Sequence, residues 1–379
     1  MPNPATRFSI ALTLTRNVGI SGSLLGRSMG NEIALRLRDK YASVSWTQKL
    51  DCLRDIVAAA CLCHDLGNPP FGHSGEKTIS TYFSEGNGQA LKEQVGNREW
   101  ADLINFEGNA NSFRLLTHRF KGRRNGGMAM TYSSLASIVK YPYSSLHAGE
   151  KGKFGFFSSE EEIFRRVATQ LGMPETDSGK FARHPLVYVT EAADDICYQI
   201  MDLEDAHKLK IIGLQEVVEL LLGFFGSTDK ERMQRMMNHL DDPNEKIAYL
   251  RSNAIGAMVV DCADVFSKNE ETILAGEFRG TLVDNMNPRL KDAYAKCSAT
   301  AWNKIYCAPE VVDIELAGNR IITYLLDTLM DAVMNPDKNY SRVGYKFISV
   351  CNVYVRHHVR SEIVSAQTDE ACDNSNVYC

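Results

Sequence analysis

One short segment concentrates residue types that can bind a metal ion and move protons. It runs from Cys63 to Glu76 and reads CHDLGNPPFGHSGE. His64 and Asp65 offer an imidazole and a carboxylate, a ligand pair that suits Mn²⁺, Fe²⁺, Co²⁺, Zn²⁺ or Mg²⁺. Neighbouring residues on a helix point about 100° apart, because the helix turns once in roughly 3.6 residues. The two side chains can therefore share an ion only at its edge, and other elements must supply further ligands.

The same segment carries a second pairing of an imidazole with a carboxylate. A glycine- and proline-shaped turn, GNPPFG, leads from the first pair to His73, and Glu76 follows one helical turn later, where it can orient that imidazole. Any one of these residues alone is explained as well by a helix cap or a satisfied polar group. Two histidines and two carboxylates around one such turn are harder to explain by packing, so we predict a functional site here.

A second acidic stretch lies farther along the chain. Asp194, Tyr198 and Asp202 are spaced at i, i+4 and i+8, which puts them along one face of a helix. Apolar neighbours such as Ile196 and Ile200 indicate that this face is partly buried, where uncompensated charges are costly. A metal at one end and polar groups of a ligand farther along would compensate the acids. A solvated acidic face is the alternative.

The elements that must position these residues are predicted to be helical almost throughout. Apolar residues recur at three- and four-residue spacing before the first cluster, and Asn68-Pro69-Pro70 should end that helix, because proline cannot continue the hydrogen-bond ladder. Ser159–Glu162 fits a capping box at the start of another helix. Helices are predicted over 31–44, 47–64, 74–83, 107–119, 131–140, 159–171, 186–207, 214–224, 228–239, 244–268 and 309–334.

The composition is that of an ordinary globular protein. Of 379 residues, 44% are apolar and 23% are charged, which excludes a wholly disordered or collagen-like chain. The net charge of −5 argues against a broadly basic nucleic-acid coat. Apolar runs fall short of the roughly 20 residues that span a bilayer, and ten cysteines are too few for a disulfide scaffold, so we expect a cytoplasmic protein. The scarcity of strand patterns and repeats favours one continuous all-α domain.

Five segments together resemble a known family. They are CHDLGNPPFGHSGE (63–76), FEGNANSFRLL (106–116), KYP (140–142), KFGFF (153–157) and HPLVYVTEAADDICYQIMDLEDAHKL (184–209). They resemble the deoxyguanosine triphosphate triphosphohydrolases (dGTPases), which are HD-domain metal-dependent phosphohydrolases. The resemblance implies the helical HD-domain fold and hydrolysis of dGTP, or of other dNTPs, to a deoxynucleoside and tripolyphosphate. It also implies a divalent metal ion as cofactor, either Mg²⁺, Mn²⁺ or another transition metal.

The resemblance implies a role for each residue of the first cluster. His64 and Asp65 match the family's central metal pair, and Asp194 matches its distal aspartate. His73 matches the catalytic histidine, with Glu76 as its carboxylate partner. An imidazole oriented in this way can move a proton, because its reference pKa of about 6.5 lies near working pH.

The resemblance also implies substrate contacts. Tyr198 looks like the residue that packs on the deoxyribose and helps to exclude a 2′-hydroxyl, and Asp202 like the residue that receives the 3′-hydroxyl. Arg114 and Lys140 are candidates for holding the tripolyphosphate portion, with surface helix charges as the alternative. Asn109 is a candidate for contacting base or phosphate, or else a helix cap.

The resemblance fades at both ends of the chain. The family's first metal histidine normally stands shortly before a Gly-Arg-Ser segment, here 26–28, but this sequence has Leu14-Thr15-Arg16-Asn17. We therefore divide the chain into an irregular N-terminal segment (1–25), a dNTP triphosphohydrolase core (26–350) and an irregular C-terminal tail (351–379). We favour a gene fragment or a reading-frame error at both ends. A divergent protein with a three-ligand or inactive site is the competing interpretation.

Other functions remain open at this point. One is a different HD-type nucleotidase or phosphodiesterase. Another is a catalytically impaired nucleotide-binding or oligomerising protein, because the first metal histidine is missing. By resemblance, the expected partners are dGTP or another dNTP, further copies of the chain in a homo-oligomer, and single-stranded DNA as an effector in some members; no membrane partner is expected.

Overall fold

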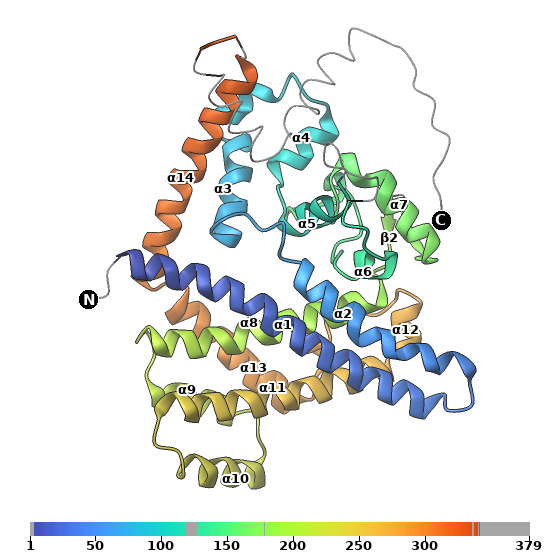
Figure 1. Cartoon of the computed structure of the whole chain (residues 1–379), viewed down its shortest axis with the longest axis vertical. Coiled ribbons are helices and arrows are strands. Elements are labelled where there is room, and N and C mark those ends of the chain that lie inside the picture. Colours follow the sequence, from blue (N-terminus) through green and yellow to red (C-terminus); the bar gives the residue numbers. More distant parts are fainter. Residues whose placement is uncertain (1–3, 119–126, 178, 336, 340, 342–379) are drawn as a thin grey trace.

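The protein is built from helices, as the computed structural model shows (Figure 1). It describes residues 4–118, 127–177, 179–335, 337–339 and 341, with the backbone alone for 4–19, 46 and 48. The α-helices are α1 Pro4–Lys40, α2 Asp51–Cys63, α3 Gly72–Ser84, α4 Asn97–Ile104, α5 Gly108–Thr117, α6 Tyr132–Ala136, α7 Glu161–Gln170, α8 Pro185–Lys208, α9 Leu214–Leu222, α10 Ser227–Met237, α11 Pro243–Lys268, α12 Glu270–Leu274, α13 Pro288–Thr300 and α14 Pro309–Met334. The all-α prediction is confirmed.

The described residues contain one small sheet. Strands β1 (Glu175–Asp177) and β2 (Lys180–Phe181) pair in antiparallel fashion, with Asp177 opposite Lys180. The sheet is too small to contribute a layer of its own. Within the described residues, none of the helices combines the length and the apolarity that a bilayer crossing requires.

Helix α8 lies at the centre of the larger hydrophobic core. It begins where Pro185 follows His184, whose Nδ1 accepts a hydrogen bond from the backbone nitrogen of Leu186 at 3.3 Å and so caps the helix. Most of its side chains are buried against α1, α2, α11 and α13. The remaining face carries Asp194, Tyr198 and Asp202, so the expected alignment of these three residues is observed.

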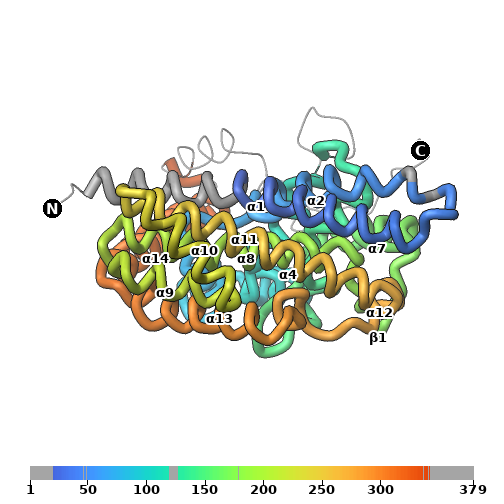
Figure 2. The backbone as a smooth tube through the Cα atoms, turned by 90° about the horizontal axis from the view of Figure 1, so that it is seen from below, coloured from blue at the N-terminus to red at the C-terminus, as the bar shows by residue number. Residues whose placement is uncertain are grey.

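Helix α1 is longer than the sequence indicated. It runs unbroken from Pro4 to Lys40, so the expectation of an irregular segment over 1–25 is wrong for residues 4–25. Leu25, Met29 and Ile33 recur every fourth residue and are buried, and α1 packs beside α2 (Figure 2) and across α8. No proline follows Pro4 within α1, so no residue there breaks the hydrogen-bond ladder of the helix. The predicted tail at 351–379 lies outside the described residues.

Three further helix starts differ from the predictions. Helix α2 begins at Asp51 rather than at residue 47, because a 3₁₀ turn, Ser45–Leu50, precedes it. Helix α3 begins at Gly72 rather than at Ser74, directly after Phe71, whose backbone is left-handed with φ of 70°. The predicted capping box at 159–162 does not form, because α7 is preceded by a 3₁₀ turn and its N-cap residue makes no side-chain bond. Ser158 in that turn is held instead by Asp102, whose Oδ2 accepts from its backbone nitrogen at 2.8 Å.

Candidate active site

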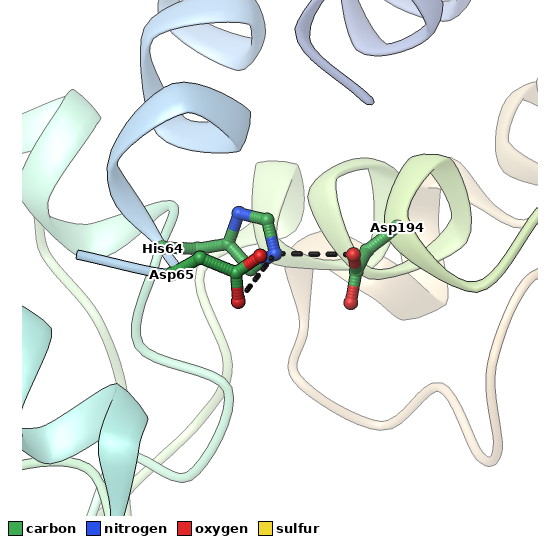
Figure 3. Close-up of side chains that lie close together, drawn as sticks. All are labelled: His64, Asp65 and Asp194. Atoms are coloured by element: carbon green, nitrogen blue, oxygen red, sulfur yellow. Dashed lines mark ion pairs between the residues drawn. The ribbon is translucent and has the colours of Figure 1, made fainter. Parts of the chain in front are cut away.

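His64, Asp65 and Asp194 come together at one point (Figure 3). Nε2 of His64 lies 3.3 Å from Oδ1 of Asp65 and 3.1 Å from Oδ1 of Asp194. Potential ligand atoms of all three residues lie within 4.8 Å of one another. The first two residues directly follow α2, and the third lies in the middle of α8. Among the described residues no other group of three His, Cys, Asp or Glu side chains meets this spacing.

The imidazole of His64 is set up as a ligand. Its Nδ1 lies 2.8 Å from the carbonyl oxygen of Cys61, which can only accept, so Nδ1 carries the proton and Nε2 presents its lone pair. His64 is only 8% exposed, and Nε2 is buried without a hydrogen-bond partner. A buried lone pair between two carboxylates is a donor set that fits a divalent cation.

The electrostatics of the cluster favour a positive charge at its centre. Burial lowers the pKa of His64, but the nearby carboxylates of Asp194 and Asp65 outweigh it and raise this pKa to about 9. Burial also raises the pKa of Asp65, against the opposing charge of His64. A proton and a metal ion therefore compete for the same nitrogen, so metal binding should release a proton.

Helix α5 fixes the loop that follows His64. The backbone nitrogen of Gly67 donates to Oγ of Ser112 at 2.8 Å, and Nδ2 of Asn111 donates to the Gly67 carbonyl at 2.8 Å. A Cβ at Gly67 would run into the backbone nitrogen of Ser112, so this close approach requires glycine. Asn68, in the same loop, donates from Nδ2 to Oδ1 of Asp65 at 2.8 Å and so orients that carboxylate.

His73 and Glu76 form the second pair that the sequence indicated. Nδ1 of His73 lies 2.9 Å from Oε2 of Glu76, and this hydrogen bond raises the pKa of the exposed imidazole. Glu76 is buried, and its Oε1 accepts from the backbone nitrogen of Gly108 at 2.7 Å. Nζ of Lys153 lies 3.4 Å from Oε2 of Glu76 and 2.8 Å from Oε1 of the buried Glu107. Burial raises the pKa of Glu76, but His73 and Lys153 outweigh it and lower this pKa.

Comparison with known proteins points in the same direction. The sequence model of the HD domain matches residues 24–119, which include the His64–Asp65 pair. A deoxyguanosinetriphosphate triphosphohydrolase-like protein of Pseudomonas aeruginosa is 37% identical over 314 residues, covering 82% of this chain and 70% of the relative. One of Synechocystis is 34% identical over 334 residues (84% and 72%). The deoxyguanosinetriphosphate triphosphohydrolase of Yersinia enterocolitica is 30% identical over 367 residues (84% and 70%).

The chain belongs to the deoxyguanosinetriphosphate triphosphohydrolase family. The family predicted from the five motifs is thereby confirmed, together with its place among the HD-domain proteins. HD-domain phosphohydrolases depend on a metal ion, which agrees with the donor set around His64.

The dGTPase motif on α8 continues from Asp194 towards the C-terminal end of the helix. Tyr198 is 39% exposed. Asp202 accepts a hydrogen bond through Oδ2 from the hydroxyl of Tyr306 at 2.6 Å. Burial raises the pKa of Asp202 to about 6, against the opposing effect of this hydrogen bond. Tyr306 was missed in the sequence, because a single tyrosine far along the chain carries no spacing signal that links it to Asp202.

Two dGTPase-motif residues on α5 are engaged within the protein. The backbone nitrogen of Asn109 donates to Oε2 of Glu107 at 2.6 Å, and its Nδ2 donates to Oε1 of the same residue at 3.1 Å. Glu107, rather than Asn109, is thus the N-cap of α5. The guanidinium of Arg114 lies over the ring of Phe157 at 5.5 Å, and its Nε lies 3.9 Å from Oε1 of Glu160. The roles of Asn109 and Arg114 towards a substrate stay predictions.

Lys140 flanks the acidic helix instead of lying on a free surface. Its Nζ is 2.9 Å from Oε1 of Glu191, one turn before Asp194 on α8, and the same carboxylate is paired with Arg183. Burial raises the pKa of Asp195 to about 7, and the charge of Lys140 opposes this effect. Lys140 therefore brings positive charge to the half of α8 that carries the metal cluster.

Proposed function

We propose that this chain hydrolyses dGTP to deoxyguanosine and inorganic tripolyphosphate at a divalent ion held by His64, Asp65 and Asp194. The observation that carries the proposal is the meeting of a buried imidazole nitrogen, which has no hydrogen-bond partner, with one carboxylate that follows α2 and one on α8. The names of the relatives support the choice of dGTP. Other dNTPs are included as alternative substrates.

In this proposal the three ligands hold the ion beside the innermost phosphate. When bound, a divalent ion there would neutralise phosphate charge and make water more acidic. The chain's own part is to fix the donors: Cys61 sets the tautomer of His64, and Asn68 orients Asp65. The donors are thus held in place before substrate arrives.

His73 is the proposed proton-transfer group. Glu76 engages its Nδ1, so Nε2 is the nitrogen left to hold or move a proton at a substrate oxygen. The pairing with Glu76 keeps the imidazole protonated to a higher pH than an isolated histidine, since its pKa is raised. Glu76 itself is held rigidly by the nitrogen of Gly108 and by Lys153, so the imidazole is oriented.

The proposed substrate contacts follow the face of α8. Tyr198 would pack on the deoxyribose and crowd a 2′-hydroxyl, which supports a preference for deoxy sugars. Asp202 would accept the 3′-hydroxyl. Lys140 would offer positive charge to the polyphosphate. Arg114 and Asn109 remain candidates for the phosphates and the base.

The test is a product assay. Purified chain is incubated with dGTP or GTP and with Mn²⁺ or Mg²⁺, and tripolyphosphate, pyrophosphate and orthophosphate are separated by ion-exchange chromatography. The proposal predicts tripolyphosphate and deoxyguanosine from dGTP, with much less product from GTP. Pyrophosphate or orthophosphate as the first product would instead indicate another HD-type nucleotidase or phosphodiesterase.

A second candidate is nucleotide binding without turnover. It is favoured by the sequence Leu14-Thr15-Arg16-Asn17, which stands where the family pattern has its first metal histidine. A guanidinium has no lone pair for a metal ion, so Arg16 cannot replace that ligand. Binding of dGTP in a calorimetric titration, together with the absence of any released phosphate product, would support this candidate.

A further inference from the structure

The turn that leads into α3 contains two consecutive residues with a left-handed backbone. Phe71 has φ of 70° and Gly72 has φ of 56°, and His73 follows as the second residue of α3. Glycine adopts this conformation freely, but for a bulky residue such as phenylalanine it is an outlier. A strained residue persists only where its surroundings hold it in place. The position of His73 therefore depends on what holds Phe71.

Helix α14 accommodates the Phe71 ring at a glycine. A Cβ added to Gly318, in the interior of α14, would lie 2.5 Å from Cγ, 2.6 Å from Cδ2 and 2.8 Å from Cδ1 of Phe71. Gly318 is buried, and the ring lies directly against its backbone. Any side chain at this position would force the ring to move, so the close approach of α14 to the turn requires glycine.

The same helix also holds the first turns of α3. Helix α14 lies alongside α3 (Figure 1). Ile322, one helical turn after the glycine, is buried, and its Cδ1 would lie 3.3 Å from a Cβ added to Gly75. Nδ2 of Asn319 donates to Oγ1 of Thr78 at 3.1 Å. These contacts fix α14 against α3, and with it the place where the Phe71 ring lies.

The carboxylate that orients His73 is anchored from another side. Oε1 of Glu76 accepts from the backbone nitrogen of Gly108 at 2.7 Å, and Nζ of Lys153 lies 3.4 Å from its Oε2. The 2.9 Å hydrogen bond between His73 and Glu76 thus joins an imidazole placed by the Phe71 turn to a carboxylate held by α5 and Lys153. A shift confined to the first turn of α3 would disturb this alignment.

We propose that Gly318 is a positioning residue for His73: by leaving space for the Phe71 ring, it holds the first turn of α3 where His73 meets Glu76. The inference rests on the proposed role of His73 in hydrolysis. It gives α14, which lies outside the sequence motifs, a part in proton transfer. Alanine forms helices more readily than glycine, so α14 itself would gain from Gly318→Ala, and a loss of activity would come from the displaced ring.

The first test is steady-state hydrolysis of dGTP by Gly318→Ala. We expect kcat to fall about tenfold, because a displacement of about 1 Å can cost up to about 10²-fold, while KM stays within about twofold and bound Mn²⁺ is unchanged. Gly256→Ala is the matched control: Gly256 lies in the interior of α11, and an added Cβ would meet none of the described residues within 4 Å outside its own stretch of helix. It should leave kcat and KM as they are. An unchanged kcat in Gly318→Ala would overturn the inference.

A double-mutant cycle tests whether the two residues act through one contact. Phe71→Leu removes the ring and should lower kcat by a similar factor. Adding Gly318→Ala to this variant should change kcat by less than about twofold, because the ring that it would displace is already gone. Losses that simply multiply would overturn the inference.

Titration of His73 tests the inference without turnover. The hydrogen bond to Glu76 raises the pKa of this imidazole, against burial and the charge of Lys153, and the charge of Glu107 adds to the increase. The pKa is measured by NMR of histidines labelled at Cε1 in the presence of Mg²⁺, and the signal is assigned by its absence in His73→Gln. In Gly318→Ala the pKa should fall towards the ordinary value of about 6.5, and in Gly256→Ala it should not change.

The two proposals can therefore fail separately. If the chain releases no tripolyphosphate but the pKa of His73 falls in Gly318→Ala, the positioning role of Gly318 stands although the hydrolysis proposal has failed. A pKa of His73 that is the same in Gly318→Ala as in the unmodified chain would overturn the role of Gly318, whether or not dGTP is hydrolysed.

Discussion

Replacing Lys153 by methionine tests the network behind the proposed catalytic histidine. Methionine keeps an unbranched side chain of similar length but removes the charge. In the structure Nζ of Lys153 is the cation between two buried carboxylates, 2.8 Å from Glu107 and 3.4 Å from Glu76. Glu107 is only 1% exposed and Glu76 is 7% exposed, so water cannot replace the lost charge.

The expected cost follows from these contacts. Each charge-assisted hydrogen bond contributes about 1.5–3 kcal/mol, and removing one partner from a buried ion pair costs about 3–5 kcal/mol. For Lys153→Met we expect a loss of about 3–5 kcal/mol in the free energy of unfolding, the cost of breaking one buried ion pair. The loss should not be larger, because other hydrogen bonds to both carboxylates remain. At roughly 2 °C per kcal/mol for a chain of this size, Tm should fall by about 6–10 °C.

The pH dependence of this loss has a definite sign. In the folded protein the pKa of Glu76 is lowered, so its contribution to stability is present above the pKa of the unfolded state and is lost as pH falls through the folded pKa. Without Lys153 the pKa of Glu76 in the folded protein should rise. Protonation of Glu76 at low pH should then remove a buried negative charge and restore part of the variant's stability. The difference in Tm between the two proteins should therefore be largest near pH 8 and should narrow towards pH 5.

The assay is thermal unfolding by calorimetry across that pH range. Lys151→Met is the matched control, since Lys151 is an exposed lysine two residues away, and its Tm should match that of the unmodified chain. A Tm loss in Lys153→Met as small as in the control would refute the assigned role. A loss that grows as pH falls would refute the electrostatic reasoning.

Three further predictions concern the site and helix α8. Asp194→Ala should abolish turnover and should also lose the bound Mn²⁺, as measured by elemental analysis after gel filtration. Retention of the metal would contradict the ligand assignment. His73→Ala should lower kcat by about 10²-fold or more while the metal content stays unchanged, and an equal loss of metal would show that His73 is a ligand instead. Burial lowers the pKa of His184 to about 4, so its contribution is lost as pH falls from about 6.5 towards 4, on the order of 3 kcal/mol; in urea unfolding, His184→Asn should lose less over this range, and identical pH profiles would contradict the assignment.

Long, strongly periodic helices could be predicted from the sequence. The predicted run 244–268 became α11 and the predicted run 309–334 became α14. Short helices escaped prediction, as for α4, because eight residues give too few repeats of an apolar pattern. The extent of α1 escaped for a different reason: its N-terminal half shows no period, but no residue interrupts a helix that packing stabilises farther along.

The site could be predicted in part. The residue types of the CHD segment and the alignment of Asp194, Tyr198 and Asp202 are local properties that a helical period reveals. The meeting of α2 with α8, and the contacts of Lys153 and Tyr306, depend on tertiary packing between segments far apart in the chain. Arg114 and Lys140 show the same limit, since their charges were evident in the sequence but their carboxylate neighbours were not.

Locating a bound ion tests the central claim most directly. Crystals of the chain grown with Mn²⁺ would be measured for anomalous scattering. We expect one strong peak at about 2.2 Å from Nε2 of His64, and in contact with carboxylate oxygens of Asp65 and Asp194. A fully occupied Mn²⁺ peak elsewhere, with none at these three residues, would contradict the metal centre on which the proposed reaction depends. The absence of any anomalous peak would contradict it as well.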